Sequence, residues 1–259
     1  MSIITLTTDF GTLYPASMKA VILNINRNAN IVDITHSIPQ ADIRAGAFAL
    51  YSVVDFFPKG SVHVAVVDPG VGTERRAIAI KAGRQYFVGP DNGLMIPAAK
   101  KLGEIEVYDV TNRKLFHEVS HTFHGRDIFA PVGGYLSRGF DIMDVGERIN
   151  DPVDLEIENA QLKDEIISGE VLFTDDFGNV ITNIPKDMVL GIADYGSEIE
   201  VSGRRIPFLE TYGNIKIGEP LALIGSHGFF ELSVNQGSGA EVLKLKNGDR
   251  VEVKTHFQS

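Results

Sequence analysis

One apolar run, residues 62–67, ends abruptly in Asp68-Pro69-Gly70 and constrains the fold more than any other stretch of the chain. β-branched residues dominate the run and a Pro-Gly break follows it, so it predicts a buried strand with Asp68 at its carboxyl end. In an open α/β sheet, ligands bind at that edge because the loops there converge on a crevice. Arg75 and Arg76 follow a few residues later. The stretch therefore predicts a ligand site, although a loop whose aspartate only caps local amides has the same composition.

The composition excludes several classes of protein. The chain has 259 residues, of which 44% are apolar, enough for one large domain or two smaller ones. A formal charge of -10 argues against nucleic-acid and anionic-membrane partners. With no cysteine, disulfides, thiolate metal sites and a cysteine nucleophile are ruled out, and a reducing, cytoplasmic location is expected. No signal peptide is visible, and no apolar run approaches the roughly 20 residues that span a bilayer.

Strands and helices alternate in the first part of the chain. Asp9 follows an apolar run at 3–6 and so has the same placement as Asp68. Further strands are predicted at 30–34, 77–81, 85–88 and 106–110, and helices at 17–26, 42–56 and 127–138. This alternation predicts an α/β domain over residues 1–150, with a mostly parallel sheet and flanking helices.

The character of the sequence changes after residue 150. Residues 151–164 are charged and lack periodicity, so they are interpreted as a linker. From 165 to 259 short apolar runs recur between Gly and Asn residues, with strands predicted at 166–173, 180–184, 198–201, 205–208, 220–224, 229–234, 241–245 and 250–254. This pattern is typical of an all-β sandwich or barrel domain.

A literal zinc signature, His-Glu-x-x-His, occupies residues 117–121. The motif binds zinc only on a helix, where both histidines share one face. Its flanks are loop-like, and His124 offers a third ligand without the helical geometry. No metal is therefore expected.

Several polar loops carry residues suited to chemistry. His124 precedes a helix, where it either is incidental or orients water beside Asp68. Asn179 offers the donor and acceptor that a purine edge needs, and the neighbouring Asp176 could hold an ammonium group. Ser226 and Glu231 lie in and after a turn between two predicted strands. Each loop taken alone is equally typical of a structural turn.

Five motifs together resemble one known family. They are Thr7-Thr8-Asp9-Phe10-Gly11, Val67-Asp68-Pro69-Gly70-Val71-Gly72-Thr73, Gly89-Pro90-Asp91-Asn92-Gly93, Phe123-His124-Gly125-Arg126-Asp127 and Asp176-Phe177-Gly178-Asn179. With these motifs in this order, the chain resembles the S-adenosyl-L-methionine hydroxide adenosyltransferases. These enzymes are relatives of the fluorinating and chlorinating enzymes. The resemblance extends over almost the whole chain.

The resemblance implies an architecture and a set of site residues. It implies a homotrimer in which each site lies between the N-terminal domain of one subunit and the C-terminal domain of the next. Asp68, Arg75 and His124 match the set that positions water, and Asp9 matches the carboxylate that binds the ribose diol. Asn179 matches the adenine-binding residue. The remaining substrate-binding candidates are Asp176, Tyr212, Ser226, Glu231 and Val234.

The resemblance also implies a reaction, the hydrolysis of S-adenosyl-L-methionine to adenosine and L-methionine by attack of water or hydroxide on C5'. S-adenosyl-L-methionine is then the substrate, and no further cofactor is expected. Two alternatives stay open: a halogenase of the same family, and a non-catalytic adenosine-binding protein. The retention of Asp68, Arg75 and His124 as a set favours hydrolysis.

Overall fold

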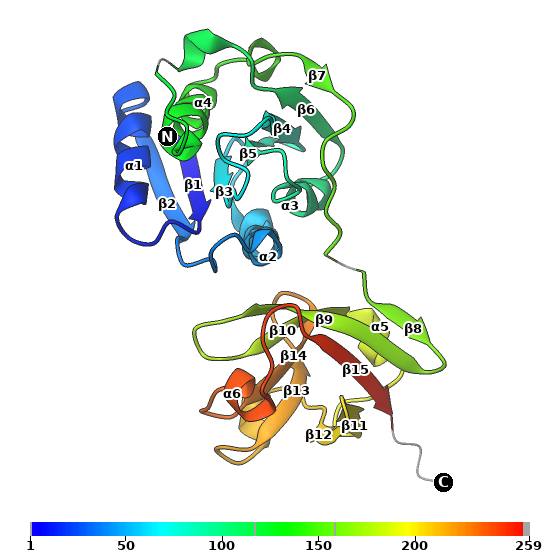
Figure 1. Ribbon diagram of the computed structural model, residues 1–259. Helices are drawn as coiled ribbons and strands as arrows, with labels where there is room; N and C mark the ends of the chain where they lie inside the picture. The colour runs from blue at the N-terminus through cyan, green and yellow to red at the C-terminus, as the bar shows by residue number, and fades with distance from the viewer. Residues whose placement is uncertain (1, 117, 158, 256–259) are drawn as a thin grey trace. The chain divides into compact units, whose positions relative to one another are not determined.

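The computed structural model describes residues 2–116, 118–157 and 159–255, and the chain forms two compact units, Met1–Leu155 and Glu156–Ser259 (Figure 1). The boundary falls inside the segment 151–164 that was predicted as the linker. Among the described residues, no helix has both the length and the apolar character needed to cross a membrane.

The first unit is built on a mixed sheet. Within the described residues its strand order is β2-β1-β3-β5-β4-β6-β7. The four strands from β2 to β5 are parallel, and the outer pairings involving β4, β6 and β7 are antiparallel. The strands are β1 Ser2–Thr8, β2 Ala29–Thr35, β3 Val62–Val66, β4 Ala77–Ala82, β5 Gln85–Pro90, β6 Ile105–Asp109 and β7 Arg148–Ile149. The strands predicted at 77–81 and 85–88 are confirmed as β4 and β5, and their antiparallel pairing makes the sheet mixed.

Helices pack on both faces of this sheet. Helices α1 (Tyr14–Ile25) and α4 (Ala130–Ser137) pack against each other over β1 and β3, whereas α2 (Ile43–Val53) packs against α3 (Ile96–Lys101). Asp42 caps α2 by accepting a hydrogen bond from the Ala45 backbone N–H at 2.9 Å. The core on the α1/α4 side buries the side chains of Ile4, Leu6, Met18, Ile22, Val62, Val64, Phe129 and Val132. Burial on both faces explains why β3 is apolar apart from His63.

One buried residue of β3 is polar. The His63 ring of β3 is fully buried, with Thr5 Oγ1 at 2.8 Å from Nδ1 and Gln85 Oε1 at 2.5 Å from Nε2. Because the Gln85 amide donates to the carbonyls of Val54 and Phe57, its oxygen must face His63, and the ring proton lies on Nε2. The network thus holds a neutral imidazole inside the sheet.

The second unit is an antiparallel sheet that nearly closes on itself. Within the described part of the chain its order is β12-β11-β15-β9-β10-β14-β13, with β8 beside β9, and a bridge from Phe208 to Ala222 brings the two edges together. The strands are β8 Gln161–Lys163, β9 Ile166–Thr174, β10 Val180–Pro185, β11 Glu198–Val201, β12 Arg204–Pro207, β13 Pro220–Ile224, β14 Phe229–Val234 and β15 Arg250–Thr255. The barrel-like core encloses the buried rings of Phe208 and Phe230. An α/β unit followed by a separate all-β unit confirms the predicted fold class at this level.

Two predicted elements differ from the structure. The strand expected at 241–245 is wrong, because Gly239–Leu243 forms helix α6, which Ser238 caps by accepting from the Glu241 N–H at 3.2 Å. The helix expected at 127–138 begins instead as a π-helical turn, Gly125–Phe129, and continues as α4. A further short helix, α5 (Lys186–Leu190), follows β10 and was not predicted.

The buried His63 makes the protein sensitive to acid. Burial lowers the pKa of His63 from 6.5 to about 4, so between these values the unfolded chain binds a proton that the folded protein excludes. We expect the free energy of unfolding to fall as the pH drops from 6.5 to 4, by about 3 kcal/mol in total. Denaturant melts across this range measure the loss.

Replacing the imidazole identifies the residue responsible for this acid sensitivity. His63→Gln keeps a polar group between Thr5 and Gln85 but does not titrate, so its unfolding free energy should depend less on pH in this window. His121→Gln, which removes an exposed histidine, is the control and should keep the wild-type dependence. Equal pH dependence in both variants would show that His63 is not the group responsible.

Candidate active site

Asp9 and Asp68 follow neighbouring parallel strands and therefore share one edge of the sheet. Thr8 of β1 is the register partner of Val66 of β3; Asp9 comes directly after Thr8, and Asp68 comes two residues after Val66. Asp9 Oδ2 accepts a hydrogen bond from the Ala41 backbone N–H at 2.9 Å, and no described residue donates to Asp9 Oδ1. One carboxylate oxygen is thus anchored and the other is available. Ala41 was not predicted as a site residue, because a backbone contact leaves no signal in the side chain.

Asp68 and Arg75 form a largely buried ion pair. The exposed fractions of their side chains are 4% and 12%. Arg75 Nε lies 2.9 Å from Asp68 Oδ1 and 3.1 Å from Oδ2, and Arg75 Nη2 also donates to Oδ2. The guanidinium carbon lies 5.2 Å from the centre of the Phe129 ring. This multidentate arrangement compensates the cost of burying both charges and holds the guanidinium in one plane.

Arg75 in turn fixes the state of His124. Its Nη2 lies 2.8 Å from His124 Nδ1, and because a guanidinium only donates, Nδ1 must accept and the ring proton must lie on Nε2. Burial and the charge of Arg75 lower the pKa of His124 and outweigh the opposing charges of Asp68 and Asp127. The imidazole is therefore neutral at neutral pH and has its N–H group on the side away from Arg75. Asp68 thus orients the Arg75 guanidinium, and Arg75 in turn sets the tautomer of His124.

Gly72 allows the loop after β3 to approach the loop that carries His124. It has a φ of 77°, which favours glycine, and a Cβ atom there would collide with the His121 carbonyl oxygen. Gly70 lies close to the Arg75 side chain.

A second histidine lies at the same sheet edge. His36 follows β2, and its Nδ1 lies 2.9 Å from Thr8 Oγ1, while its Nε2 lies 3.1 Å from Asp33 Oδ1. Thr8 Oγ1 also accepts from the Phe10 backbone N–H at 3.3 Å. His36 therefore braces the turn that holds Asp9. The signal in the sequence was its place at the end of a predicted strand, three residues after Asp33.

In the second unit, Asn179 is held by its own loop. Its Nδ2 donates to Asp175 Oδ2 at 2.9 Å, and its backbone N–H donates to Asp175 Oδ1 at 2.8 Å. Asp176, the aspartate that the sequence favoured, is exposed and has no hydrogen bond or ion pair among the described residues. Two adjacent acidic residues cannot be told apart by spacing, and here Asp175 is the one that faces the asparagine.

Tyr212 and Glu231 belong to a compact hydrogen-bonded group. Glu231 accepts from the Tyr212 hydroxyl at 2.5 Å and from Ser233 Oγ at 2.8 Å, and His227 Nε2 lies 3.3 Å away. Burial acts to raise the pKa of Glu231, but hydrogen bonds from His227, Tyr212 and Ser233 hold it below its usual value. Burial and the bond to Glu231 raise the pKa of Tyr212. The group therefore keeps a buried carboxylate ionised.

The remaining predicted residues lie outside this hydrogen-bonded group. Ser226 is exposed in the turn before β14, and Val234 is 4% exposed at the end of that strand. The β10–β14 register pairs Val180 with Leu232 and so places Asn179 opposite Ser233, one step further along. Asn179 is thereby close to the Glu231 group, whereas the roles of Ser226, Val234 and Asp176 stay predictions.

The zinc signature is not helical where the structure describes it. His117 lies outside the described residues, and residues 118–121 contain no helix. Among the described residues, no three His, Asp or Glu side chains are placed to hold a metal ion. That the protein binds no metal stays a prediction.

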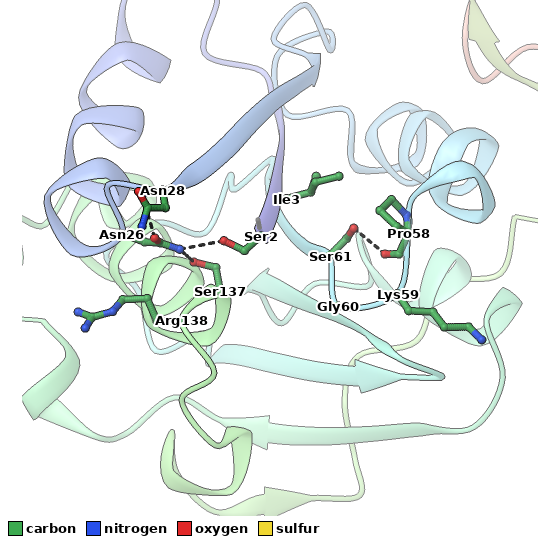
Figure 2. A pocket seen from close by; sticks show the side chains of 10 residues that line it. All are labelled: Ser2, Ile3, Asn26, Asn28, Pro58, Lys59, Gly60, Ser61, Ser137 and Arg138. Carbon is green, nitrogen blue, oxygen red and sulfur yellow. Dashed lines mark hydrogen bonds between the residues drawn. The ribbon is translucent and has the colours of Figure 1, made fainter.

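A polar pocket of about 570 Å³ lies at the opposite end of the same strands (Figure 2). It opens beside the first residues of β1 and β3, and Asn26 Nδ2 ties two of its walls together by donating to Ser2 Oγ at 2.9 Å and Ser137 Oγ at 2.8 Å. None of the predicted site residues lines this pocket. In this unit the predicted residues therefore gather at the carboxyl edge of the parallel strands, away from the pocket.

Comparisons with known proteins cover nearly the whole chain. Residues 4–146 match the family model described as the SAM hydroxide adenosyltransferase N-terminal domain, and residues 169–252 match the corresponding C-terminal domain. A protein from Thermus thermophilus named (R)-S-adenosyl-L-methionine hydrolase is 38% identical over 257 residues, which cover 93% of this chain and 94% of that protein. A solved structure of a conserved protein from Thermotoga maritima has a TM-score of 0.90 and 39% identity, covering 97% of this chain and 99% of that one.

Fluorinases are more distant relatives. One from Actinoplanes sp. is 28% identical over 290 residues, with 97% of each chain covered.

The state of His124 can be tested without any ligand. Arg75→Met removes the cation that lowers the pKa of His124 and also frees the Asp68 carboxylate, so we expect that pKa to rise. Nitrogen NMR of the imidazole should show the proton on Nε2 in the wild type and a mixture of tautomers in the variant.

The neighbouring arginine supplies the control. Arg76 bonds to Asp91 and Asp151 instead of His124, so Arg76→Met should leave the His124 titration unchanged. A His124 pKa that is the same in Arg75→Met and wild type would contradict the described geometry.

Proposed function

Because this chain belongs to the SAM hydroxide adenosyltransferase family, we propose that it hydrolyses S-adenosyl-L-methionine to adenosine and L-methionine. The family predicted from the five motifs is thus confirmed. The observation that carries the proposal is the match over nearly the full chain to proteins named as hydrolases of this compound, at 36–38% identity. Arg75 contacts both Asp68 and His124, so the three residues that the family resemblance assigns to positioning water lie next to one another.

The reaction is a displacement at C5'. An oxygen of water or hydroxide forms a bond to C5', the C5'–S bond breaks, and the electron pair remains on sulfur. The sulfonium leaves as a neutral thioether, so its departure requires no acid. The protein must instead position the oxygen in line with the C5'–S bond, and the proton that water loses in forming hydroxide passes to bulk solvent.

The polar chain of the first unit is suited to hold that oxygen. Arg75 is locked by Asp68, and it leaves His124 neutral with an N–H group on Nε2. In our proposal this Nε2–H donates to the attacking oxygen, and the nearby guanidinium charge favours its hydroxide form. Because the groups are already oriented, little reorganisation is needed during the reaction.

The remaining predicted residues would bind the nucleoside and the amino acid. Asp9 has a carboxylate oxygen available for the ribose hydroxyls. Asn179 is assigned to adenine, and Tyr212, Glu231, Asp176, Ser226 and Val234 are proposed to complete the substrate site. S-adenosyl-L-methionine is the substrate itself, and we propose that no further cofactor or metal takes part. Metal analysis of the purified protein tests that part.

The names of the relatives specify one epimer at the sulfonium sulfur. Sulfur in this compound bears three different carbon groups and is a stereocentre. We propose that this chain also prefers the R epimer. Incubation with each epimer separately, followed by quantification of adenosine, tests this preference.

Variants of the polar chain test the proposed catalysis. Arg75→Met and His124→Gln should each reduce kcat by about 10²- to 10⁴-fold, because they remove groups that orient and stabilise the nucleophile. Water labelled with heavy oxygen should place the label on the 5'-hydroxyl of adenosine, as mass spectrometry can show.

The controls separate the alternatives. Arg76→Met should keep wild-type activity, since the Arg76 guanidinium bonds to Asp91 and Asp151 and, among the described residues, makes no hydrogen bond to Asp68 or His124. If a 5'-halogenated adenosine is the main product in the presence of fluoride or chloride, the protein is a halogenase and not a hydrolase. Adenosine binding without turnover of either epimer would instead identify a non-catalytic binding protein.

The trimer implied by the resemblance can be tested by complementation. We propose a homotrimer with sites between subunits and a cytoplasmic location. Sedimentation should give three times the 28.3 kDa mass of one chain. Arg75→Met and Asn179→Ala chains, each with little activity alone, should recover activity when mixed, because a shared site takes one residue from each chain. Failure to recover in proven mixed trimers would place both residues of a site in the same chain.

A further inference from the structure

The loop between β9 and β10 is organised by the carboxylate of Asp175. Asp175 Oδ1 accepts the backbone N–H groups of Phe177 at 2.9 Å and Asn179 at 2.8 Å, while Oδ2 accepts the side-chain Nδ2 of Asn179 at 2.9 Å. The Gly178 N–H donates to the Asp175 carbonyl at 2.9 Å. One aspartate therefore shapes the turn with one oxygen and holds a side-chain amide with the other.

The loop is also fixed from outside. Gly178 has a φ of 80°, and a Cβ atom there would collide with Ser238. Its carbonyl accepts the Ala240 N–H at 2.9 Å, at the start of α6. Because backbone contacts hold both sides of the turn, the Asn179 side chain has a defined position relative to Asp175.

This arrangement determines which way the Asn179 amide faces. An ionised carboxylate only accepts hydrogen bonds, so the Nδ2 group must face Asp175, and Oδ1 must face away from it. Turning the amide over would set its oxygen against Asp175 Oδ2. Asn179 is 8% exposed, and no described residue donates to its Oδ1. The side chain thus presents an acceptor that has no donor among the described residues and is available to a ligand.

We propose that Asp175 is the positioning residue that makes this protein select 6-aminopurine over 6-oxopurine nucleosides, by holding Asn179 with its amide oxygen toward the purine. The proposal rests on the proposed function, in which Asn179 binds adenine. Adenine has an N–H₂ donor at position 6, which suits an acceptor, whereas hypoxanthine has a carbonyl at the same position. A polar group in a nearly buried site that meets the wrong partner is left unpaired, which is a strong source of discrimination.

The Asp175→Asn variant should exchange this preference. Only an oxygen can accept the Phe177 and Asn179 backbone N–H groups, so the new side chain keeps Oδ1 in that place and sets its Nδ2 where Oδ2 was. Its N–H₂ group then faces the Asn179 amide, which must turn over and present its own N–H₂ group outward. The turn keeps its backbone hydrogen bonds, so the variant should fold, as circular dichroism and thermal melts can verify.

The test measures binding of adenosine and inosine by calorimetry. We expect the wild type to bind adenosine at least about tenfold more tightly than inosine, and Asp175→Asn to lose or reverse this ratio. Asp249→Asn is the matched control: this aspartate also accepts a backbone N–H in a turn of the same unit, from Lys246 at 3.0 Å, and its replacement should keep the wild-type ratio. The ratio of kcat/KM for S-adenosyl-L-methionine and its 6-oxo analogue should change in the same direction.

The outcomes separate the proposal from the function on which it rests. A wild-type preference for adenosine that persists in Asp175→Asn overturns the role of Asp175, even if the protein hydrolyses its substrate normally. Equal binding of adenosine and inosine by the wild type also overturns it. An exchanged preference in a protein that does not turn over S-adenosyl-L-methionine supports the role of Asp175 and contradicts the hydrolase function.

Discussion

The candidate site in the first unit depends on the ion pair between Asp68 and Arg75. The pair is nearly buried, and removing either partner leaves a charge without compensation, at a cost of about 3–5 kcal/mol. Its effect extends beyond stability, because the guanidinium held by Asp68 is also the group that sets the tautomer of His124. The three residues come from two loops, and Gly72 lets those loops approach closely enough for the contact. A carboxylate at the end of a strand thus determines the protonation state of a ring from a distant part of the sequence.

The sequence predicted the strand ends well because the pattern behind them is local. An apolar run that stops at Asp9 or Asp68 indicates a strand and its edge, and parallel pairing of β1 with β3 then brings the two aspartates together. The choice between adjacent residues of like charge had a different basis: Arg75 was preferred to Arg76 through the family resemblance, and no pattern pointed to Asp175, whose carboxylate holds the asparagine. Such choices depend on which way a side chain leaves the backbone, and spacing does not encode that direction. The strand expected at 241–245 failed for another reason, since the cap at Ser238 outweighs the β-propensity of a short segment.

The two units use the same physical device. In each, an aspartate whose two oxygens are both engaged holds a second polar side chain, Arg75 in one case and Asn179 in the other, so that a single orientation remains. In both units the aspartate determines which polar group its neighbour presents. Glu231 differs, because it gathers three donors around one carboxylate. Oriented dipoles of this kind act without reorganising, which is what recognition and catalysis both require.

The contact of Asp9 with Ala41 has a consequence for how the site can change over evolution. Ala41 has a φ of 63°, a conformation that costs a non-glycine residue about 1 kcal/mol or more, and its N–H group is what anchors the carboxylate. Since the donor belongs to the main chain, no replacement at position 41 other than proline removes it, and glycine would relieve the strain without losing the bond. The identity of residue 41 can therefore drift while Asp9 keeps its orientation. The orientation of Asp9 therefore depends on the backbone conformation of the turn at residue 41 and not on the alanine side chain.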